Sequence, residues 1–153
     1  AGAKFVRFVT VYRPEQMPGQ KNRDYPWPYY EGLMMDEAMN ELALLAFGLY
    51  GHPLNKQNGA PVRIVLPWKY GFKSIKSVTE IVFVKKRPGT LWSDISREYG
   101  FFANTHPGFA HPRWSQATER FLNTQERIPT RIYNGYGDYV AHLYNERDRR
   151  YYF

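Results

Sequence analysis

Residues 58–76 read Asn58-Gly59-Ala60-Pro61-Val62-Arg63-Ile64-Val65-Leu66-Pro67-Trp68-Lys69-Tyr70-Gly71-Phe72-Lys73-Ser74-Ile75-Lys76. The apolar part of this run, Val62 to Leu66, predicts a short strand, because β-branched and aliphatic residues follow one another between turn residues. The loop Trp68 to Lys76 follows and predicts no long regular element. The run therefore places a strand, a glycine-containing loop and four cationic side chains within nineteen residues.

The cations of this run suit an anionic ligand. Arg63 on the strand offers a planar, bidentate guanidinium, whereas lysine offers a mobile ammonium group. The three lysines of the loop are Lys69, Lys73 and Lys76. Backbone N–H groups around Gly71 to Ile75 add a dipolar cradle that phosphates favour. We expect a pocket for a phosphate-bearing ligand; the alternative is a solvated basic loop between two strands.

The composition fits one globular domain. The 153 residues are enough for one sizeable core and too few for two, so we expect a single domain over residues 1–153. Aromatic residues make up 18% of the chain, which excludes the disordered class. The 21 Lys and Arg against 14 Asp and Glu give a net charge of +7, which favours an anionic partner without identifying it.

The absence of cysteine excludes several kinds of site. Without a thiol, this chain supplies no disulfide, no cysteine-bound zinc, no iron–sulfur cluster and no thiol nucleophile. No apolar stretch approaches the ~20 residues that span a bilayer. The start, Ala1-Gly2-Ala3-Lys4, carries neither an initiator Met nor a signal-peptide apolar region, so we expect a soluble chain already shortened at its N-terminus.

The remaining pattern predicts an α+β fold that is mixed and strand-rich. Strands are expected over residues 4–12, 77–85 and 131–133, and a loop over residues 14–28. Asp36 is expected to cap a buried helix over residues 37–47, because the second half of this segment is apolar all round. Short helices are expected over residues 92–99 and 115–122.

Carboxylates and histidines carry weaker signals. Glu31, Asp36, Glu37 and Glu41 lie close in sequence and could include an acid–base pair, but helix capping explains Asp36 and Glu37 better, and an exposed turn explains Glu41. His106 and His111 each lie close to proline in a loop without cysteine or paired acids, so they predict structural roles and no metal site. The catalytic residues stay unassigned.

Aromatic residues beside basic ones leave a binding module open. Trp68-Lys69-Tyr70, Arg113-Trp114 and Arg149-Arg150-Tyr151-Tyr152 are of the kind that stacks on single-stranded bases. No recognised nucleic-acid motif accompanies them, so a non-catalytic nucleic-acid module is the third hypothesis and no nucleic-acid partner is expected.

Several ordered motifs carry a resemblance. They are Pro14-Glu15-Gln16-Met17-Pro18-Gly19-Gln20, Gln57 to Arg63, Pro67 to Ser77, His111-Pro112-Arg113-Trp114-Ser115-Gln116-Ala117-Thr118-Glu119-Arg120 and Tyr133-Asn134-Gly135-Tyr136. Over essentially its whole length the chain resembles the protein-methionine-sulfoxide reductase branch of the sulfite-oxidase-type molybdoenzymes. The resemblance implies part of their molybdopterin-binding fold, and reduction of methionine sulfoxide in periplasmic proteins.

The same resemblance implies the cofactor and its binding residues. The positions that match cofactor-binding residues of the family are Thr10, Asn58, Arg63, Ser74, Ile75 and Lys76. Ser74 stands where the family usually has glycine. The cofactor implied is Mo-molybdopterin, and the partners implied are a haem-bearing membrane subunit as electron donor and oxidised periplasmic proteins as substrates.

The resemblance covers only the C-terminal half of the enzyme. The family's molybdenum-ligating cysteine lies upstream of the matched segment, so we expect this chain to lack the metal ligand, to be inactive alone, and to need the upstream half as a partner. A half fold is also expected to expose apolar surface. A relative acting on sulfite or another sulfoxide or oxyanion is the second hypothesis.

Overall fold

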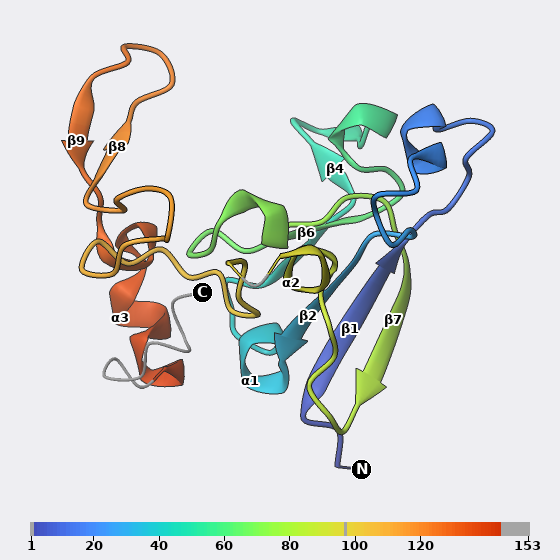
Figure 1. Ribbon diagram of the computed structural model, residues 1–153, viewed down its shortest axis with the longest axis horizontal. Helices are drawn as coiled ribbons and strands as arrows, with labels where there is room; N and C mark the ends of the chain where they lie inside the picture. Colours follow the sequence, from blue (N-terminus) through green and yellow to red (C-terminus); the bar gives the residue numbers. More distant parts are fainter. Residues whose placement is uncertain (1, 97, 145–153) are drawn as a thin grey trace.

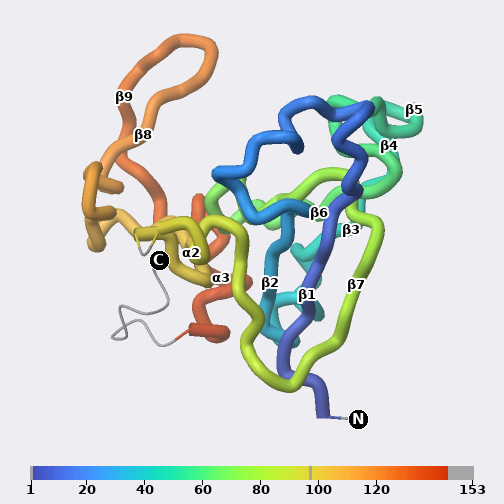
Figure 2. The backbone as a smooth tube through the Cα atoms, turned by 45° about the vertical axis from the view of Figure 1, so that its right-hand side comes forward, coloured from blue at the N-terminus to red at the C-terminus, as the bar shows by residue number. Residues whose placement is uncertain are grey.

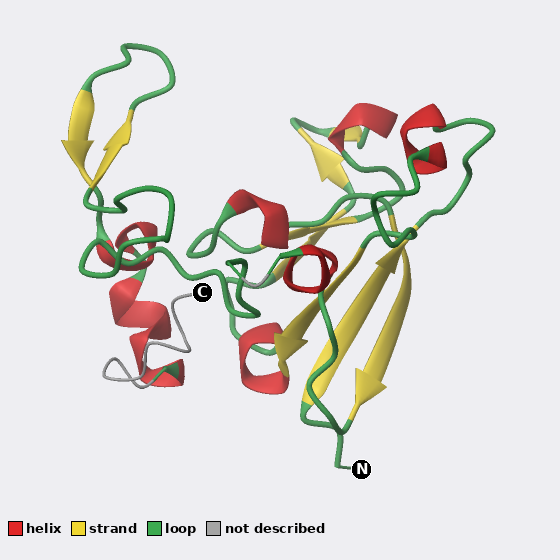
Figure 3. Cartoon of the chain, viewed as in Figure 1, coloured by secondary structure: helices red, strands yellow, loops and turns green. Residues whose placement is uncertain are grey.

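The computed structural model describes residues 2–96 and 98–144. Its nine strands in this part of the chain are β1 (Phe5–Thr10), β2 (Tyr30–Met34), β3 (Leu44–Ala46), β4 (Gly48–Leu49), β5 (His52–Pro53), β6 (Arg63–Val65), β7 (Val78–Val84), β8 (Thr118–Arg120) and β9 (Arg127–Pro129). The α-helices are short: α1 (Met35–Ala38), α2 (Leu91–Ile95) and α3 (Gly137–Val140). Figure 3 shows strands and loops predominating over helix, which confirms the mixed, strand-rich α+β class.

The largest sheet is three-stranded and antiparallel, in the order β2-β1-β7. Central β1 pairs Phe8 with Glu31 on β2 and with Ile81 on β7. Burial alternates along β1, so Val6, Phe8 and Thr10 face inward, as the period of two in a strand requires. The pairing of β1 with β7 is irregular between Val9 and Thr10, at the C-terminal end of β1; Figure 1 shows the three strands side by side.

The remaining strands form two-stranded units: β3 with β6, β4 with β5, and β8 with β9. Figures 1 and 2 both show the β8–β9 hairpin projecting away from the sheet. Short 3₁₀ helices interrupt the loops, at Pro18–Lys21, Lys56–Asn58, Gly71–Lys73, Ile132–Gly135 and Ala141–Leu143. The loops are therefore held by local turns more than by long elements.

One apolar core runs from the sheet to the C-terminal helices. Its buried members are Val6, Phe8, Leu33, Ile64, Leu66, Trp68, Ile75, Val78, Phe101, Phe102, Tyr133, Val140 and Tyr144. Trp68 lies at its centre with no exposed surface, and its Nε1 donates to the Tyr144 hydroxyl at 2.8 Å. The expected single domain over residues 1–153 stays a prediction.

The helix expected over residues 37–47 is wrong. Helix α1 ends at Ala38, and β3 takes up Leu44 to Ala46 as the partner of β6. The Asn40 side chain accepts a hydrogen bond from the Leu42 N–H at 3.0 Å, which favours a turn over a helix. Asp36 is not the cap either, since the helix begins after Met34.

The C-terminal third also differs from expectation. The helix expected over residues 115–122 is strand β8, and the strand expected at residues 131–133 belongs to a 3₁₀ helix, while β9 precedes it. Helix α2 is shorter than the expected 92–99 and starts after Thr90, whose side chain accepts from the Ser93 N–H.

The strands expected over 4–12, 62–66 and 77–85 are confirmed as β1, β6 and β7. Within the described residues, no helix has the length and apolar character needed to cross a bilayer.

Candidate functional site

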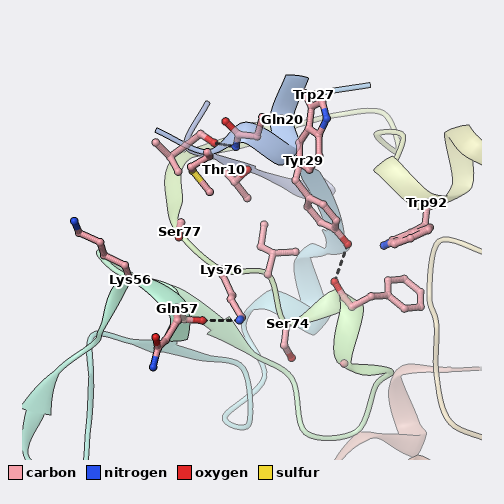
Figure 4. A pocket seen from close by; sticks show the side chains of 15 residues that line it. Thr10, Gln20, Trp27, Tyr29, Lys56, Gln57, Ser74, Lys76, Ser77 and Trp92 are labelled. Atoms are coloured by element: carbon pink, nitrogen blue, oxygen red, sulfur yellow. Dashed lines mark hydrogen bonds between the residues drawn. The ribbon is translucent and has the colours of Figure 1, made fainter. Parts of the chain in front are cut away.

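A cavity of about 510 Å³ opens where β1 ends, and we call it the main pocket (Figure 4). The Pro-rich segment before β2, the 3₁₀ helix at Lys56–Asn58, the basic loop and α2 all contribute to it. Its lining residues are Thr10, Val11, Met17, Gln20, Trp27, Tyr29, Lys56, Gln57, Gly71, Phe72, Ser74, Ile75, Lys76, Ser77 and Trp92. The basic loop, Trp68 to Lys76, therefore forms one wall of this cavity.

The six predicted cofactor residues gather in this region. Four of them line the main pocket: Thr10, Ser74, Ile75 and Lys76. Arg63 lies behind this wall, where its Nη2 donates to the Ser74 carbonyl at 3.0 Å and its Nη1 donates to the Asn58 carbonyl at 3.3 Å. The Arg63 guanidinium therefore connects the segment at Asn58, five residues before it in the chain, with the segment at Ser74, eleven residues after it. The role of these residues in binding a cofactor stays a prediction.

Gly59 allows the two segments to approach each other. Its φ of +109° lies in the left-handed region that glycine adopts without strain. A Cβ at this position would lie 2.8 Å from the Lys76 Cβ and 3.1 Å from the Arg63 Cβ. Lys76 Nζ in turn donates to the Gln57 carbonyl at 2.6 Å. The glycine is therefore required by the close approach of both Lys76 and Arg63 to this backbone.

The backbone of the basic loop has N–H donors without an acceptor among the described residues. Within the described part of the chain, the N–H groups of Ile75 and Lys76 donate no hydrogen bond, although both residues line the cavity. Ser74 is turned away, because its Oγ accepts from the Leu66 N–H at 3.0 Å. Its φ of −84° suits any residue, so serine in place of the family's usual glycine leaves this backbone unstrained.

Two of the four expected cations are not available to a ligand. Lys69 Nζ is fully buried and donates to Glu37 Oε1 at 2.5 Å, to the Asn104 Oδ1 at 2.7 Å and to a backbone carbonyl. Lys73 Nζ is likewise buried, with Glu31 Oε2 at 2.6 Å and two backbone carbonyls as acceptors. The expectation that these lysines are mobile is therefore wrong, because each ammonium group already has three acceptors inside the core.

The partner carboxylates were equally hidden from sequence reasoning. Glu37 does cap α1, since its Oε2 accepts from the Met34 N–H at 2.8 Å. It also accepts from the Tyr144 hydroxyl at 2.7 Å, and that contact spans 107 residues. Glu31 lies on β2 and points into the core. Sequence distance gives no signal for pairs of this kind.

Burial shifts the pKa of several of these groups. It lowers the pKa of Lys69 to about 8, against the opposing effect of Glu37. It raises the pKa of the Glu31 carboxyl, against the effect of Lys73. Burial and the nearby Glu31 also raise the pKa of Tyr29, so its hydroxyl remains a neutral donor at physiological pH.

The far wall of the main pocket is aromatic. Figure 4 shows Trp27, Tyr29 and Trp92 around the end opposite Lys56. The Tyr29 hydroxyl donates to the Phe72 carbonyl at 3.0 Å, and the rings of Phe72 and Trp92 meet edge to face. Sequence reasoning missed this wall; the only signal was an unusually long Pro-rich loop, since such loops are often functional.

His106 and His111 take part in aromatic packing. His111 is stacked on Trp114, with ring centroids 3.4 Å apart and an interplanar angle of 13°, and its Nδ1 accepts from the Arg113 N–H. His106 packs edge to face on Phe109. Residues 2–96 and 98–144 contain no group of three His, Cys, Asp or Glu side chains placed to hold a metal ion.

Comparison with known proteins adds the family. Residues 1–92, which contain all six candidate residues, match the model of the oxidoreductase molybdopterin-binding domain. The chain is 56% identical to the protein-methionine-sulfoxide reductase catalytic subunits MsrP of Xanthomonas campestris pv. campestris and Xanthomonas axonopodis pv. citri, over 99% of its own length. It is 53% identical to MsrP of Burkholderia mallei over 100% of its length.

The match is unequal in extent. The alignments cover only 48–49% of these relatives, so the chain spans about half the length of the curated proteins it matches. The family model nevertheless covers more than half of the chain, including β1 to β7 and the whole basic loop. The chain therefore belongs to the oxidoreductase molybdopterin-binding domain family.

Proposed function

We propose that this chain forms part of a molybdopterin-dependent reductase that converts methionine sulfoxide in proteins to methionine. The observation that carries the proposal is the cluster of Arg63, Asn58, Ser74 and Lys76 beside a cavity of about 510 Å³, in a chain 56% identical to MsrP. When bound, the cofactor would supply the redox metal and accept the sulfoxide oxygen. The chain's own residues would hold and orient it.

The two ends of the main pocket fit the two parts of a molybdopterin. Lys76 and the N–H groups of Ile75 and Lys76 suit a phosphate, because an ammonium and backbone dipoles both favour an anion. The aromatic wall suits a flat heterocycle, since offset rings attract one another. Arg63 would fix the phosphate end by holding the Asn58 and Ser74 carbonyls in place.

The molybdenum ligand would come from outside this sequence. The family binds its metal through a thiolate, and this chain has no cysteine. We infer that the upstream half of the enzyme supplies it, and that the chain alone is inactive. The relatives' greater length supports this inference.

The apolar surface fits the same partner. Met39, Leu44, Leu45, Ile81 and Phe83 are exposed around one hollow of about 180 Å³ on the sheet and β3. Exposed apolar patches of this kind mark protein contacts. We propose that the upstream half covers them.

The proposed location, electron donor and substrates rest on the resemblance to the reductase family. We propose a periplasmic enzyme whose electrons come from a haem-bearing membrane subunit and whose substrates are oxidised periplasmic proteins. The printed names of the relatives, catalytic subunits of a protein-methionine-sulfoxide reductase, support a protein substrate. A relative acting on sulfite or another oxyanion is not favoured by those names.

The nucleic-acid alternative is not favoured either. Trp68 and Lys69 are buried, so this aromatic–basic pair offers no stacking platform. Arg113 is held by Glu98 and by the Tyr99 hydroxyl. The third group, Arg149-Arg150-Tyr151-Tyr152, lies outside the described residues.

Native mass spectrometry tests the proposal. A species at 18.1 kDa without cofactor and without reductase activity, next to a larger cofactor-containing assembly that reduces methionine sulfoxide with an artificial electron donor, is the expected result. An assembly that binds molybdopterin but acts only on sulfite or another oxyanion would contradict the proposed reaction. Full activity of the 18.1 kDa chain would overturn the need for a second half.

A further inference from the structure

A second, smaller cavity lies next to the main pocket. It has a volume of about 160 Å³, and we call it the aromatic pocket. The rings around it belong to Tyr70, Phe72, Tyr99, His111 and Trp114. The volume is close to that of one large apolar side chain, and the lining is of the kind that buries one.

Three hollows follow one another along the basic loop. Phe72 lines both the main pocket and the aromatic pocket. Tyr70, Trp114 and Gln116 line both the aromatic pocket and a third hollow of about 320 Å³. Gly71 lines both the first and the third. The segment Tyr70 to Phe72 is therefore the common edge of all three.

The third hollow is polar, and we call it the polar cleft. Hydroxyl and amide side chains surround it: Thr105, Ser115, Gln116, Thr118, Thr130 and Asn134. Such groups both donate and accept hydrogen bonds. Ser115, Gln116 and Asn134 each already form one hydrogen bond inside the protein. Their remaining polar atoms and the threonine hydroxyls match the N–H and C=O groups of an extended peptide, as the apolar pocket matches a side chain.

The aromatic pocket is held in shape by its surroundings. Phe72 and Tyr99 meet edge to face, and His111 is stacked on Trp114. Arg113 donates to the Tyr99 hydroxyl at 2.9 Å and pairs with Glu98. A preformed site loses less conformational entropy when it binds.

We propose that this run is the groove for the polypeptide substrate. In this groove, the aromatic pocket binds an apolar side chain that neighbours the methionine sulfoxide in the substrate. The polar cleft binds the adjoining backbone. The methionine sulfoxide side chain then lies at the main pocket. The inference rests on the proposed function, which requires a protein substrate held beside the cofactor, and it adds a preference for an apolar neighbour.

Trp114 gives a direct test, because it is 41% exposed and lies outside the apolar core. The full-length enzyme that contains this sequence is assayed as wild type, Trp114→Ala and Phe121→Ala; Phe121 is a matched exposed aromatic on the β8–β9 hairpin. The substrates are free methionine sulfoxide and two peptides that carry leucine or serine beside it. The same labelled peptides are used for binding by fluorescence anisotropy.

The expected result is selective. Trp114→Ala lowers kcat/KM and affinity for the leucine peptide about tenfold, the usual scale for an aromatic contact at the centre of an interface, and leaves free methionine sulfoxide unchanged. Phe121→Ala changes neither. Equal effects of Trp114→Ala on all three substrates, or none, would overturn the groove. Trp114-dependent binding of the leucine peptide without its reduction would support the groove and overturn the proposed reaction instead.

Discussion

Lys73 and Glu31 form an ion pair inside the protein, although 42 residues separate them in the chain. The Lys73 Nζ lies 2.6 Å from Glu31 Oε2, and only 1% of either side chain is exposed. The pair ties the basic loop to β2, while Lys69 and Glu37 tie the start of the same loop to α1. The wall of the main pocket is thus fastened from inside the core, leaving its outer face to a ligand.

Breaking this pair should be costly. Glu31→Gln leaves a buried ammonium group without its counter-charge, so we expect a loss of about 3–5 kcal/mol in the free energy of unfolding, measured by urea denaturation. Lys21 and Glu15 provide the control, since they form an exposed pair. Glu15→Gln should cost less than about 1 kcal/mol. Equal losses in the two variants would mean that the inner pair does not hold the loop.

Arg63→Ala should weaken cofactor binding more than folding. The three hydrogen bonds of Arg63 to the carbonyls of Ile64, Asn58 and Ser74 are lost, so the Asn58 and Ser74 segments are no longer held together. In the full-length enzyme we expect about tenfold lower cofactor affinity or more, measured by titrating cofactor into the apo-enzyme. Arg23→Ala removes an exposed arginine of the same charge as the control. Unchanged affinity in Arg63→Ala would remove this residue from the site.

A pair of glycine variants separates backbone strain from steric overlap. Gly59→Ala and Gly51→Ala both put alanine at positive φ, which costs about 1–2 kcal/mol in stability. Only at Gly59 does the new Cβ meet Lys76, because Gly51 has open space around it. We therefore expect both to lower the thermal midpoint, and only Gly59→Ala to lower cofactor affinity. Loss of affinity in both would point to a general loss of stability.

Local pattern predicted the strands that are themselves rich in strand-forming residues. β1, β6 and β7 are rich in valine, isoleucine and phenylalanine, and burial alternates along β1 with a period of two. The segment of residues 37–47 has helical composition, yet Leu44 to Ala46 gain more by pairing with β6, so tertiary contact overrides propensity. The same holds for Thr118 to Arg120.

The candidate site was predictable only in part, for a related reason. The Asn58–Lys76 run marks its position and its charge, because these residues are adjacent in sequence. Which lysines face inward depends on Glu31 and Glu37, which come from other elements. The aromatic wall likewise joins the Pro-rich segment to α2. Contacts between distant segments leave no local pattern.

The buried Lys69 predicts a characteristic pH dependence. Its pKa of about 8 lies below the ordinary 10.5, because burial disfavours the charged ammonium. Between these two pH values the unfolded chain binds more protons than the folded one. The free energy of unfolding should therefore rise with pH across this window, by up to about 1.4 kcal/mol per pH unit from this group. Urea denaturation at a series of pH values measures it.

A double variant isolates the contribution of Lys69 from those of other titrating groups. Lys69→Met with Glu37→Gln removes both charges, and the single glutamine oxygen keeps one of the two hydrogen bonds that Oε2 and Oε1 accept from the Met34 N–H and the Tyr144 hydroxyl. The difference in stability between wild type and this variant should shift in favour of wild type as the pH passes from about 8 to 10.5. Parallel curves across that range would show that Lys69 keeps its proton in the core. Its three acceptors, rather than its burial, would then set its charge.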